Sequence, residues 1–310
     1  MSKFPIYIKA KIFYKGGIWL IEIFFRKSED AHELYHLLQV YFASSALSDQ
    51  NILQIEDNHI VKIMVDPKMK KLFEQVKNAF YQFITKYKQD DWFRRIMAEY
   101  YYYQDEEEQQ QILEIIHSII EGNRIELASF VSNIGIEKKM KDAISEIFQD
   151  NIAFSFDSFV KFRMRPLFDQ MAKYVEVSID EYKMEQEYQM FIQTLRDFLR
   201  GRQAKLHQIH VLIDDGIRFF DEHFFEIKRS ELSRMLDRKL LFNHPVYVDS
   251  VTIAPLLSIA PVSIFLYTED IEQPLVRTIH NIFEERLVLR STELFYDNKR
   301  LFSFPADEKI

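Results

Sequence analysis

The chain contains no cysteine, and only 6 glycines and 8 prolines occur among its 310 residues. Without cysteine there is neither a disulfide framework nor a thiol nucleophile, which fits an intracellular protein. The scarcity of glycine argues against a glycine-rich phosphate-binding loop, since such a loop needs several glycines at fixed spacing. Large side chains are abundant instead, with 28 Phe and 16 Tyr. This composition favours long helices and short turns.

The chain also lacks an excess of positive charge and a secretion signal. Its net charge is -8, so the whole molecule is not an electrostatic binder of nucleic acid, although a local basic patch can still be one. The opening residues, MSKFPIYIKAKIF, have no long apolar run and no small-residue cleavage site. Because 47% of the residues are hydrophobic, a disordered chain is excluded. The length of 310 residues is enough for two or three domains, and the lack of a secretion signal predicts a cytoplasmic protein.

One uncharged run is nearly long enough to cross a membrane. It spans residues 250–268 and reads SVTIAPLLSIAPVSIFLYT. Pro255 and Pro261 interrupt the run, and β-branched residues gather toward its end. It therefore predicts a short helix, a turn at Pro261 and a buried strand over Val262–Tyr267, without membrane insertion.

The longest periodic stretch begins at Pro166 and ends before Gly201. Proline suits the first turn of a helix, and glycine suits the left-handed residue that follows its last turn. The apolar residues gather on one face before Lys183 and on another face after it, rotated by roughly 140° at ~100° per residue. This change of side predicts a central helix whose two halves have different packing partners, or else a break near Lys183. The first set comprises Leu167, Phe168, Met171, Tyr174, Val175, Ile179 and Tyr182, and the second comprises Met184, Tyr188, Phe191, Ile192, Leu195, Phe198 and Leu199.

Motifs in and after this stretch resemble the YtxC-like family. They are FVKFRMRPLFDQM at 159–171, EQEY at 185–188, the spaced FI, LR and F of 191–198, LLSIAPVSIFLY at 256–267 and IHNIFEERLVL at 279–289. Together they cover about half of the chain. The resemblance implies a sporulation protein of endospore-forming bacteria, and it implies no particular reaction.

An H-E-x-x-H motif occupies residues 32–36 of a predicted helix. In zinc hydrolases the two histidines of this motif hold the metal and the glutamate acts on its water. His32 and His36 lie opposite the apolar stripe, where they are free for a metal or for solvent. A catalytic zinc needs a third ligand, and only Glu56 and His59 are available by their number in the sequence. A solvated helix face is the preferred interpretation, a zinc-dependent hydrolase is the alternative, and no cofactor is expected.

Lysines alternate with aromatic residues between positions 68 and 95. Lysines that neutralise phosphates and aromatic rings that stack on bases would together bind a nucleic acid. An amphipathic helix with its rings inward and its lysines outward explains the same pattern and is preferred, which leaves a nucleic-acid-binding module as the alternative. The residues are Lys68, Lys70, Lys71, Lys77, Lys86, Lys88, Phe73, Phe80, Tyr81, Phe83 and Tyr87, followed by Trp92, Arg94 and Arg95.

Charged residues on and beside the long helix are interpreted as structural or interaction residues. Glu185 or Glu187 is expected to form a buried ion pair with Arg163 or Arg196, and Tyr188 is expected to anchor the same network. The alternative is that neighbouring carboxylates of this segment act on a metal or a substrate. No catalytic residue is assigned.

The predicted fold is α+β in three parts. Residues 1–66 form a small ββαββ unit, residues 67–202 a helical region with the central helix at 166–200, and residues 203–310 a small α/β unit. The first part begins with a hairpin around Gly16-Gly17, which follows a strand over Ile6–Tyr14, and a second hairpin is expected around Asp57-Asn58. The last part is expected to open with a strand over Gln208–Ile213, followed by a turn and by a strand over Ile217–Ile227 that pairs back with it. Farther on, the strand over Val262–Tyr267, a helix and a second strand at 286–289 predict a parallel pair with a right-handed crossover.

The expected function is that of a cytoplasmic, sporulation-associated and non-enzymatic protein. It is expected to act through contacts with another macromolecule, which is more plausibly a protein than a nucleic acid.

Overall fold

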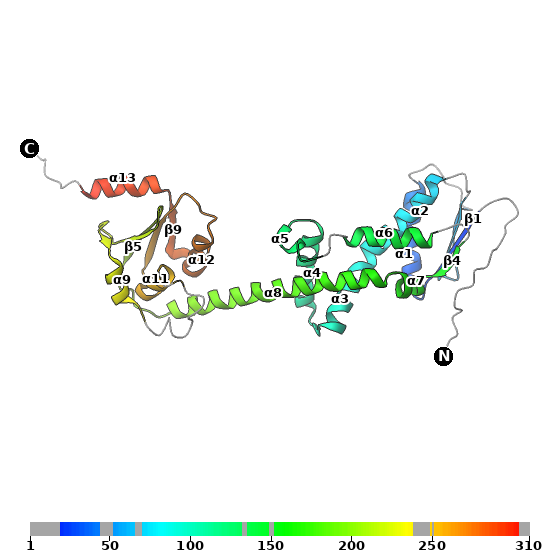
Figure 1. Ribbon diagram of the computed structural model, residues 1–310, viewed down its shortest axis with the longest axis horizontal. Helices are drawn as coiled ribbons and strands as arrows, with labels where there is room; N and C mark the ends of the chain where they lie inside the picture. Colours follow the sequence, from blue (N-terminus) through cyan, green and yellow to red (C-terminus); the bar gives the residue numbers. More distant parts are fainter. Residues whose placement is uncertain are drawn as a thin grey trace, which may run out of the picture. The chain divides into compact units, whose positions relative to one another are not determined.

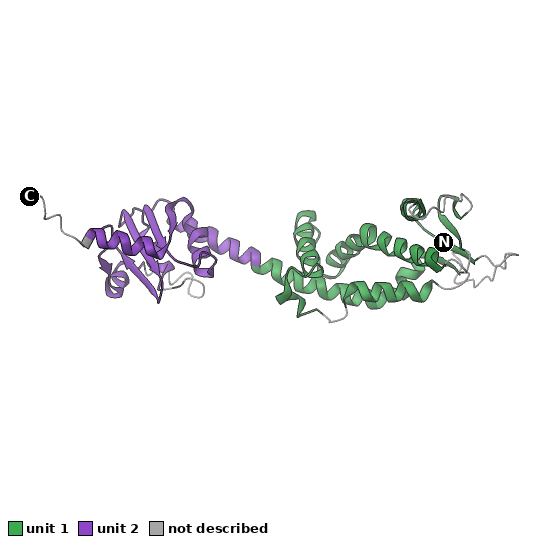
Figure 2. Cartoon of the chain, turned by 90° about the horizontal axis from the view of Figure 1, so that it is seen from above, with its two compact units in different colours: residues 1–184 green, residues 185–310 purple. Residues whose placement is uncertain are grey.

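The computed structural model describes residues 19–43, 52–65, 70–131, 135–148, 152–237, 249 and 251–303 (Figure 1). The chain divides into two compact units, residues 1–184 and residues 185–310, which Figure 2 colours separately. Each unit has its own sheet and its own hydrophobic core, so the fold is mixed α+β as predicted. The finer three-part division stays a prediction. The predicted strand at 6–14 and its glycine turn lie outside the described residues.

Unit 1 contains a four-stranded sheet in the order β2-β3-β1-β4. β1 is antiparallel to β3 and parallel to β4. Buried and half-buried side chains alternate along β3, as expected for a sheet with one face against a core. Asp57 and Asn58 form the predicted β2–β3 turn with φ values of 50° and 60°, which these two residue types tolerate well. The strands are β1 (Trp19–Phe24), β2 (Leu53–Glu56), β3 (Ile60–Val65) and β4 (Ile152–Ser155).

The helices of unit 1 bury a dense aromatic core. The ring of Phe80 lies 5.1–6.3 Å, centroid to centroid, from the rings of five other phenylalanines. These are Phe83, Phe148, Phe154, Phe156 and Phe159. Most rings of the 68–95 stretch are therefore directed into the core, as the amphipathic interpretation predicted, whereas Tyr87 is exposed. The helices are α1 (Ser28–Ala43), α2 (Lys70–Phe83), the π-helix η1 (Ile84–Lys88), α3 (Gln89–Tyr100), α4 (Glu106–Ile120), α5 (Ile125–Ala128), α6 (Ile136–Ile147) and α7 (Phe156–Arg163).

The long helix α8 (Arg165–Leu199) contributes to both cores. Its first part places Leu167, Met171, Val175 and Ile179 in the core of unit 1, and its last part places Ile192, Leu195 and Leu199 in the core of unit 2. The predicted change of packing partners is confirmed, and the alternative of a break at Lys183 is wrong. Met184, predicted to belong to the second apolar face, is 65% exposed. Gly201 follows the helix with φ of 74°, the left-handed conformation that favours glycine.

Unit 2 contains a five-stranded sheet in the order β7-β6-β5-β8-β9. β5, β8 and β9 are parallel, which confirms the predicted parallel pair β8–β9 around a helix, and β6 and β7 are antiparallel additions. The strand predicted over 217–227 is two short strands separated by a turn. The strands are β5 (Gln208–Ile213), β6 (Ile217–Phe220), β7 (Glu226–Ile227), β8 (Ser263–Tyr267) and β9 (Leu287–Arg290).

Two separate apolar clusters form in unit 2, which follows from the alternation of side chains along β5. Ile209 and Val211 belong to the larger cluster with α11 and α12, whereas Leu212 packs with Phe295 of α13. Helix α13 was not predicted from the sequence. The helices are α9 (Arg229–Met235), α11 (Ile253–Ile259), α12 (Pro274–Phe283), the 3₁₀ turn η2 (Glu284–Arg286) and α13 (Thr292–Ser303).

The uncharged run at 250–268 folds as α11 and β8, as predicted. Within the described ranges, no helix combines the length and the apolar character that a membrane span requires.

Candidate functional site

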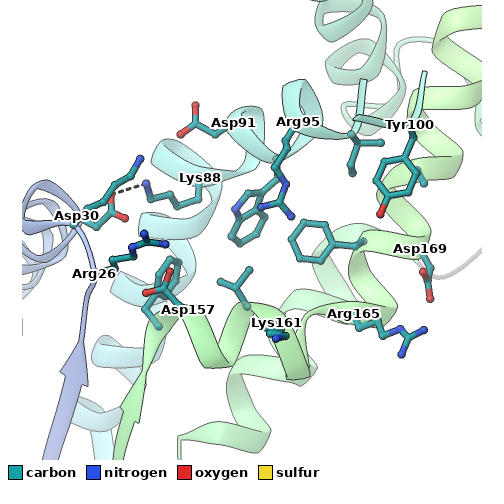
Figure 3. A pocket seen from close by; sticks show the side chains of 17 residues that line it. Arg26, Asp30, Lys88, Asp91, Arg95, Tyr100, Asp157, Lys161, Arg165 and Asp169 are labelled. Carbon is teal, nitrogen blue, oxygen red and sulfur yellow. Dashed lines mark ion pairs between the residues drawn. The ribbon is translucent and has the colours of Figure 1, made fainter. Parts of the chain in front are cut away.

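A pocket of about 890 Å³ lies within unit 1 (Figure 3). Its walls come from the loop after β1, the start of α1, helices α3 and α7, and the first turns of α8. This volume falls in the range typical of ligand-binding pockets. We call it the unit 1 pocket.

Local sequence signals place the segments that form this pocket. Ser155 caps α7 by accepting a hydrogen bond from the backbone N–H of Ser158, so that helix begins directly after β4. Helix α7 ends at Met164, and α8 begins at once with Pro166 in its first turn. The two helices therefore present successive turns to the same pocket. On the opposite wall, the carboxylate of Asp30 in α1 pairs with Lys88 at 2.5 Å, and both side chains are largely buried.

Aromatic rings form the floor of the unit 1 pocket. The rings of Trp92 in α3 and Phe168 in α8 lie 5.2 Å apart. The guanidinium carbon of Arg95 lies 5.7 Å from the centroid of the Phe168 ring, within cation–π distance. Tyr100 stands at one end of the pocket and is 71% exposed. The floor thus offers flat apolar surface beside a delocalised cation.

Charged groups of both signs surround these rings. Arg95 and Lys161 approach from opposite walls, whereas the side chain of Arg165 is directed away from the middle of the pocket (Figure 3). With the Lys88–Asp30 pair set aside, five cations remain against three carboxylates. The pocket is therefore locally basic in a chain of net charge -8. The cations are Arg26, Lys27, Lys88, Arg95, Lys161 and Arg165, and the carboxylates are Asp30, Asp91, Asp157 and Asp169.

The structure brings only part of the basic aromatic stretch to this pocket. Lys88, Trp92 and Arg95 line it, while Lys77 pairs with Glu74 and Arg94 donates to Gln109 and Gln110. Lys68 lies outside the described residues. The other pocket cations come from segments that sequence reasoning did not connect with this stretch.

The H-E-x-x-H motif lies on α1, as predicted. Nδ1 of His32 donates to the carbonyl of Ser28 at 2.8 Å, and His36 is exposed. Neither proposed third ligand is available, because Glu56 pairs with Lys62 and the ring nitrogen of His59 bonds the carbonyl of Phe25. Nowhere in the described part of the chain do three or more His, Asp or Glu side chains gather to hold a metal ion.

Glu33, the glutamate of the motif, lies beside Tyr87. The pKa of Tyr87 is raised, chiefly by loss of solvent around its hydroxyl and then by the negative charge of Glu33 and a hydrogen bond to it. This contact ties α1 to η1. The glutamate of the motif therefore contributes to the contact between these two helices.

The arginines of the predicted ion-pair network have other partners. Arg163 pairs with Glu146 at 3.5 Å, and Arg196 pairs with Glu284 at 2.7 Å. Glu185 and Glu187 are both exposed, so the expectation of a buried pair involving them is wrong. A carboxylate keeps its solvation at the surface and loses much of it in a core, so an exposed position costs less free energy.

Tyr188 and Arg196 nevertheless form hydrogen bonds with the same residue of unit 2, Asn281. The side-chain amide of Asn281 donates to the Tyr188 hydroxyl at 3.1 Å, and Nε of Arg196 donates to the Asn281 carbonyl at 2.7 Å. Asn281 lies in the last turn of α12, where a cation is favoured by the helix dipole. Together these two residues fasten the end of α8 to α12.

Sequence reasoning assigned no role to His210, a buried histidine of β5. Its side chain stacks on Phe224 with ring centroids 4.1 Å apart, and only 3% of its surface is exposed. Nδ1 donates to the Tyr267 hydroxyl at 2.9 Å, and the Gln208 amide donates to Nε2 at 2.7 Å. Burial lowers the pKa of His210 to about 4, against a smaller opposing effect of Asp221. Two signals in the sequence mark this residue, namely its place within the apolar strand IHVLI and the resemblance of His210-Val211 to the YtxC-like family.

Comparisons with known proteins agree with the resemblance noted in the sequence. Residues 74–288 match the YtxC-like family. The chain is 32% identical over 283 residues to "Uncharacterized protein YtxC" of Bacillus subtilis (strain 168), and the alignment covers 90% of this chain and 96% of that protein. No solved structure matches the chain. The family match includes α3, α7 and α8, which supply most of the unit 1 pocket. The protein belongs to the YtxC-like family.

Proposed function

We propose that the protein is a cytoplasmic, sporulation-associated protein that acts by binding another macromolecule and not by catalysis. The sporulation setting is what the resemblance to the YtxC-like family implies, and the chain belongs to that family. The single observation that carries a binding role is the unit 1 pocket.

The composition of this pocket supports recognition. Recognition sites combine a buried aromatic centre with a polar rim that remains in contact with water. Here Trp92 and Phe168 supply the centre, and the exposed side chains of Arg26, Arg95 and Lys161 supply the rim. A segment of a partner that carries negative charge fits such a site.

The test is a gene replacement in an endospore-forming host. Arg95→Glu combined with Lys161→Glu reverses two rim charges without touching the core. We expect fewer heat-resistant spores from this strain, as from a strain that lacks the gene. Lys138→Glu, which changes an exposed lysine of α6 outside the pocket, is the matched control and should sporulate normally. Normal numbers of heat-resistant spores from the deletion strain would overturn the sporulation role. A defect in that strain with none in the double variant would overturn the role of the pocket.

A further inference from the structure

The unit 1 pocket has the chemistry to recognise both halves of a nucleotide. We propose that it binds a nucleotide unit, either free or within a single-stranded nucleic acid, with the phosphate at the cationic rim and the base on the aromatic floor. This inference rests on the proposed role of the unit 1 pocket as a binding site and specifies the chemistry that the pocket recognises.

The cationic rim supplies the phosphate site. Arg26 and Lys27 come from the loop before α1, Arg95 from α3, and Lys161 from α7. Four cations from three separate segments converge on one pocket, although the chain as a whole is acidic. Side chains that converge in this way can hold a phosphate group without a glycine-rich loop, since Arg and Lys both bind phosphate oxygens directly.

Arg95 and Phe168 supply the base site. One side of the guanidinium covers the Phe168 ring, and that ring packs on Trp92. The Arg95 side chain is still 56% exposed, and its ion pair with Glu99 at 3.7 Å is a solvent-screened contact of small energy. A base stacked on the outer face of this guanidinium would extend an existing stack, because guanidinium and base planes both favour stacking.

The carboxylates of the pocket favour a nucleotide over an acidic peptide. Asp91, Asp157 and Asp169 line the same pocket as the cations. Carboxylates accept hydrogen bonds from ribose hydroxyls and from the amino groups of bases. They would repel the side chains of an acidic peptide, which carries negative charge along its length, whereas a nucleotide carries its charge at the phosphate end. The mixture of charges therefore fits a ligand that is anionic at one end and rich in donors at the other.

Isothermal titration calorimetry on the full chain tests this assignment. The probes are ATP, a single-stranded oligothymidylate, tripolyphosphate, which lacks a base, and adenosine, which lacks a phosphate. We expect ATP or the oligonucleotide to bind at least about tenfold more tightly than tripolyphosphate or adenosine, because both halves of the ligand are needed. Binding should weaken as salt is raised.

Variants locate the binding in the pocket. Arg95→Ala and Lys161→Ala should each weaken binding by about tenfold, the usual cost of losing a charged contact. Lys86→Ala, an exposed lysine of η1 outside the pocket, should change it less than about twofold. Because Arg95 and Lys161 are exposed, both variants should fold, and an unchanged urea unfolding midpoint followed by far-UV circular dichroism confirms it.

The outcomes separate the ligand sources. Tighter binding of the oligonucleotide assigns a single strand, and tighter binding of ATP assigns a free nucleotide. No heat of binding for either at about 1 mM, or binding that Arg95→Ala leaves unchanged, overturns the inference. In that case a sporulation defect in the Arg95→Glu, Lys161→Glu strain would still support a binding role for the pocket with a different ligand.

Discussion

Lowering the pH should loosen unit 2 before it loosens unit 1, because His210 is buried in its neutral form. The pKa of His210 is lowered from 6.5 to about 4 in the folded protein, mainly by burial. Between these two values the unfolded chain binds a proton at this histidine and the folded chain does not. The free energy of unfolding therefore falls as the pH falls through this range, and it loses no more on this account below it. Each unit of difference is worth about 1.4 kcal/mol, so His210 accounts for about 3 kcal/mol.

The contacts of His210 explain why the neutral ring is kept. The Gln208 amide donates to Nε2, so this nitrogen must carry a lone pair, and Nδ1 holds the proton that reaches Tyr267. Phe224 and Phe265 stack near the ring and offer no counter-charge. A second proton would have to displace the Gln208 contact in a site without solvent.

The assay compares the wild-type protein with His210→Phe, in which a ring of similar shape remains but cannot be protonated. Hydrogen exchange measured by mass spectrometry gives the opening free energy of β5 at several pH values between 7 and 4. The variant should be less stable than the wild type at pH 7, since the Tyr267 hydroxyl and the Gln208 amide lose their partner. This difference should shrink by about 3 kcal/mol as the pH reaches 4. Parallel curves for the two proteins would refute the reasoning, as would an NMR resonance of His210 that titrates near 6.5.

Three further predictions concern unit 1, where both tryptophans lie and report unfolding by fluorescence. Phe80→Ala should lower the free energy of unfolding in urea by about 3–5 kcal/mol, because Phe80 is 0% exposed and contacts five phenylalanine rings. A decrease below about 1 kcal/mol would show that this ring cluster contributes little to the stability of unit 1. Asp105→Ala should lower the free energy of unfolding by about 1 kcal/mol, because this carboxylate accepts hydrogen bonds from the backbone N–H groups of Glu107 and Glu108 at the start of α4. Asp105→Asn should retain most of the stability, because an asparagine oxygen can accept the same hydrogen bonds. Lys88→Met should lower the free energy of unfolding by roughly 2 kcal/mol, because it leaves Asp30 without its cation. Adding Asp30→Leu should recover much of that loss. Equal losses in the single and double variants would show that Lys88 and Asp30 are not energetically coupled.

Elements with a strong local pattern could be predicted from the sequence. Strand β5 was predicted with its observed bounds, and the turn at Asp57-Asn58 lies where its residue types placed it. The change of apolar face along α8 was readable because a helix repeats its faces at a fixed angle. Each of these signals is contained within a few neighbouring turns or alternations of the chain.

Elements that depend on distant partners could not be predicted. Strand β4 has four residues and becomes a strand by pairing with β1, which lies more than a hundred residues earlier in the chain. Helix α13 buries Phe295 against rings from β6 and β8, and nothing in its own residues indicates that contact. Short elements gain most of their stability from packing, so their local sequence carries little signal.

The candidate site could likewise be predicted only in part, because its residues come from segments that are distant in the sequence. The stretch from 68 to 95 was singled out because it mixes cations with rings, yet most of its rings serve the core and only its last turns reach the pocket. Arg26, Lys27 and Lys161 complete the rim, and they come from segments whose local sequence is unremarkable for binding. The pairing of β4 with β1 brings Arg26 and Lys27 beside Lys161, since β1 leads into the loop of Arg26 and β4 leads into α7. Arg95 joins them through α3, where Trp92 packs on Phe168 of α8. A four-residue strand without a clear signal of its own and a ring contact between distant helices thus bring the rim together, which is why a cation count along the sequence could find the stretch but not the site.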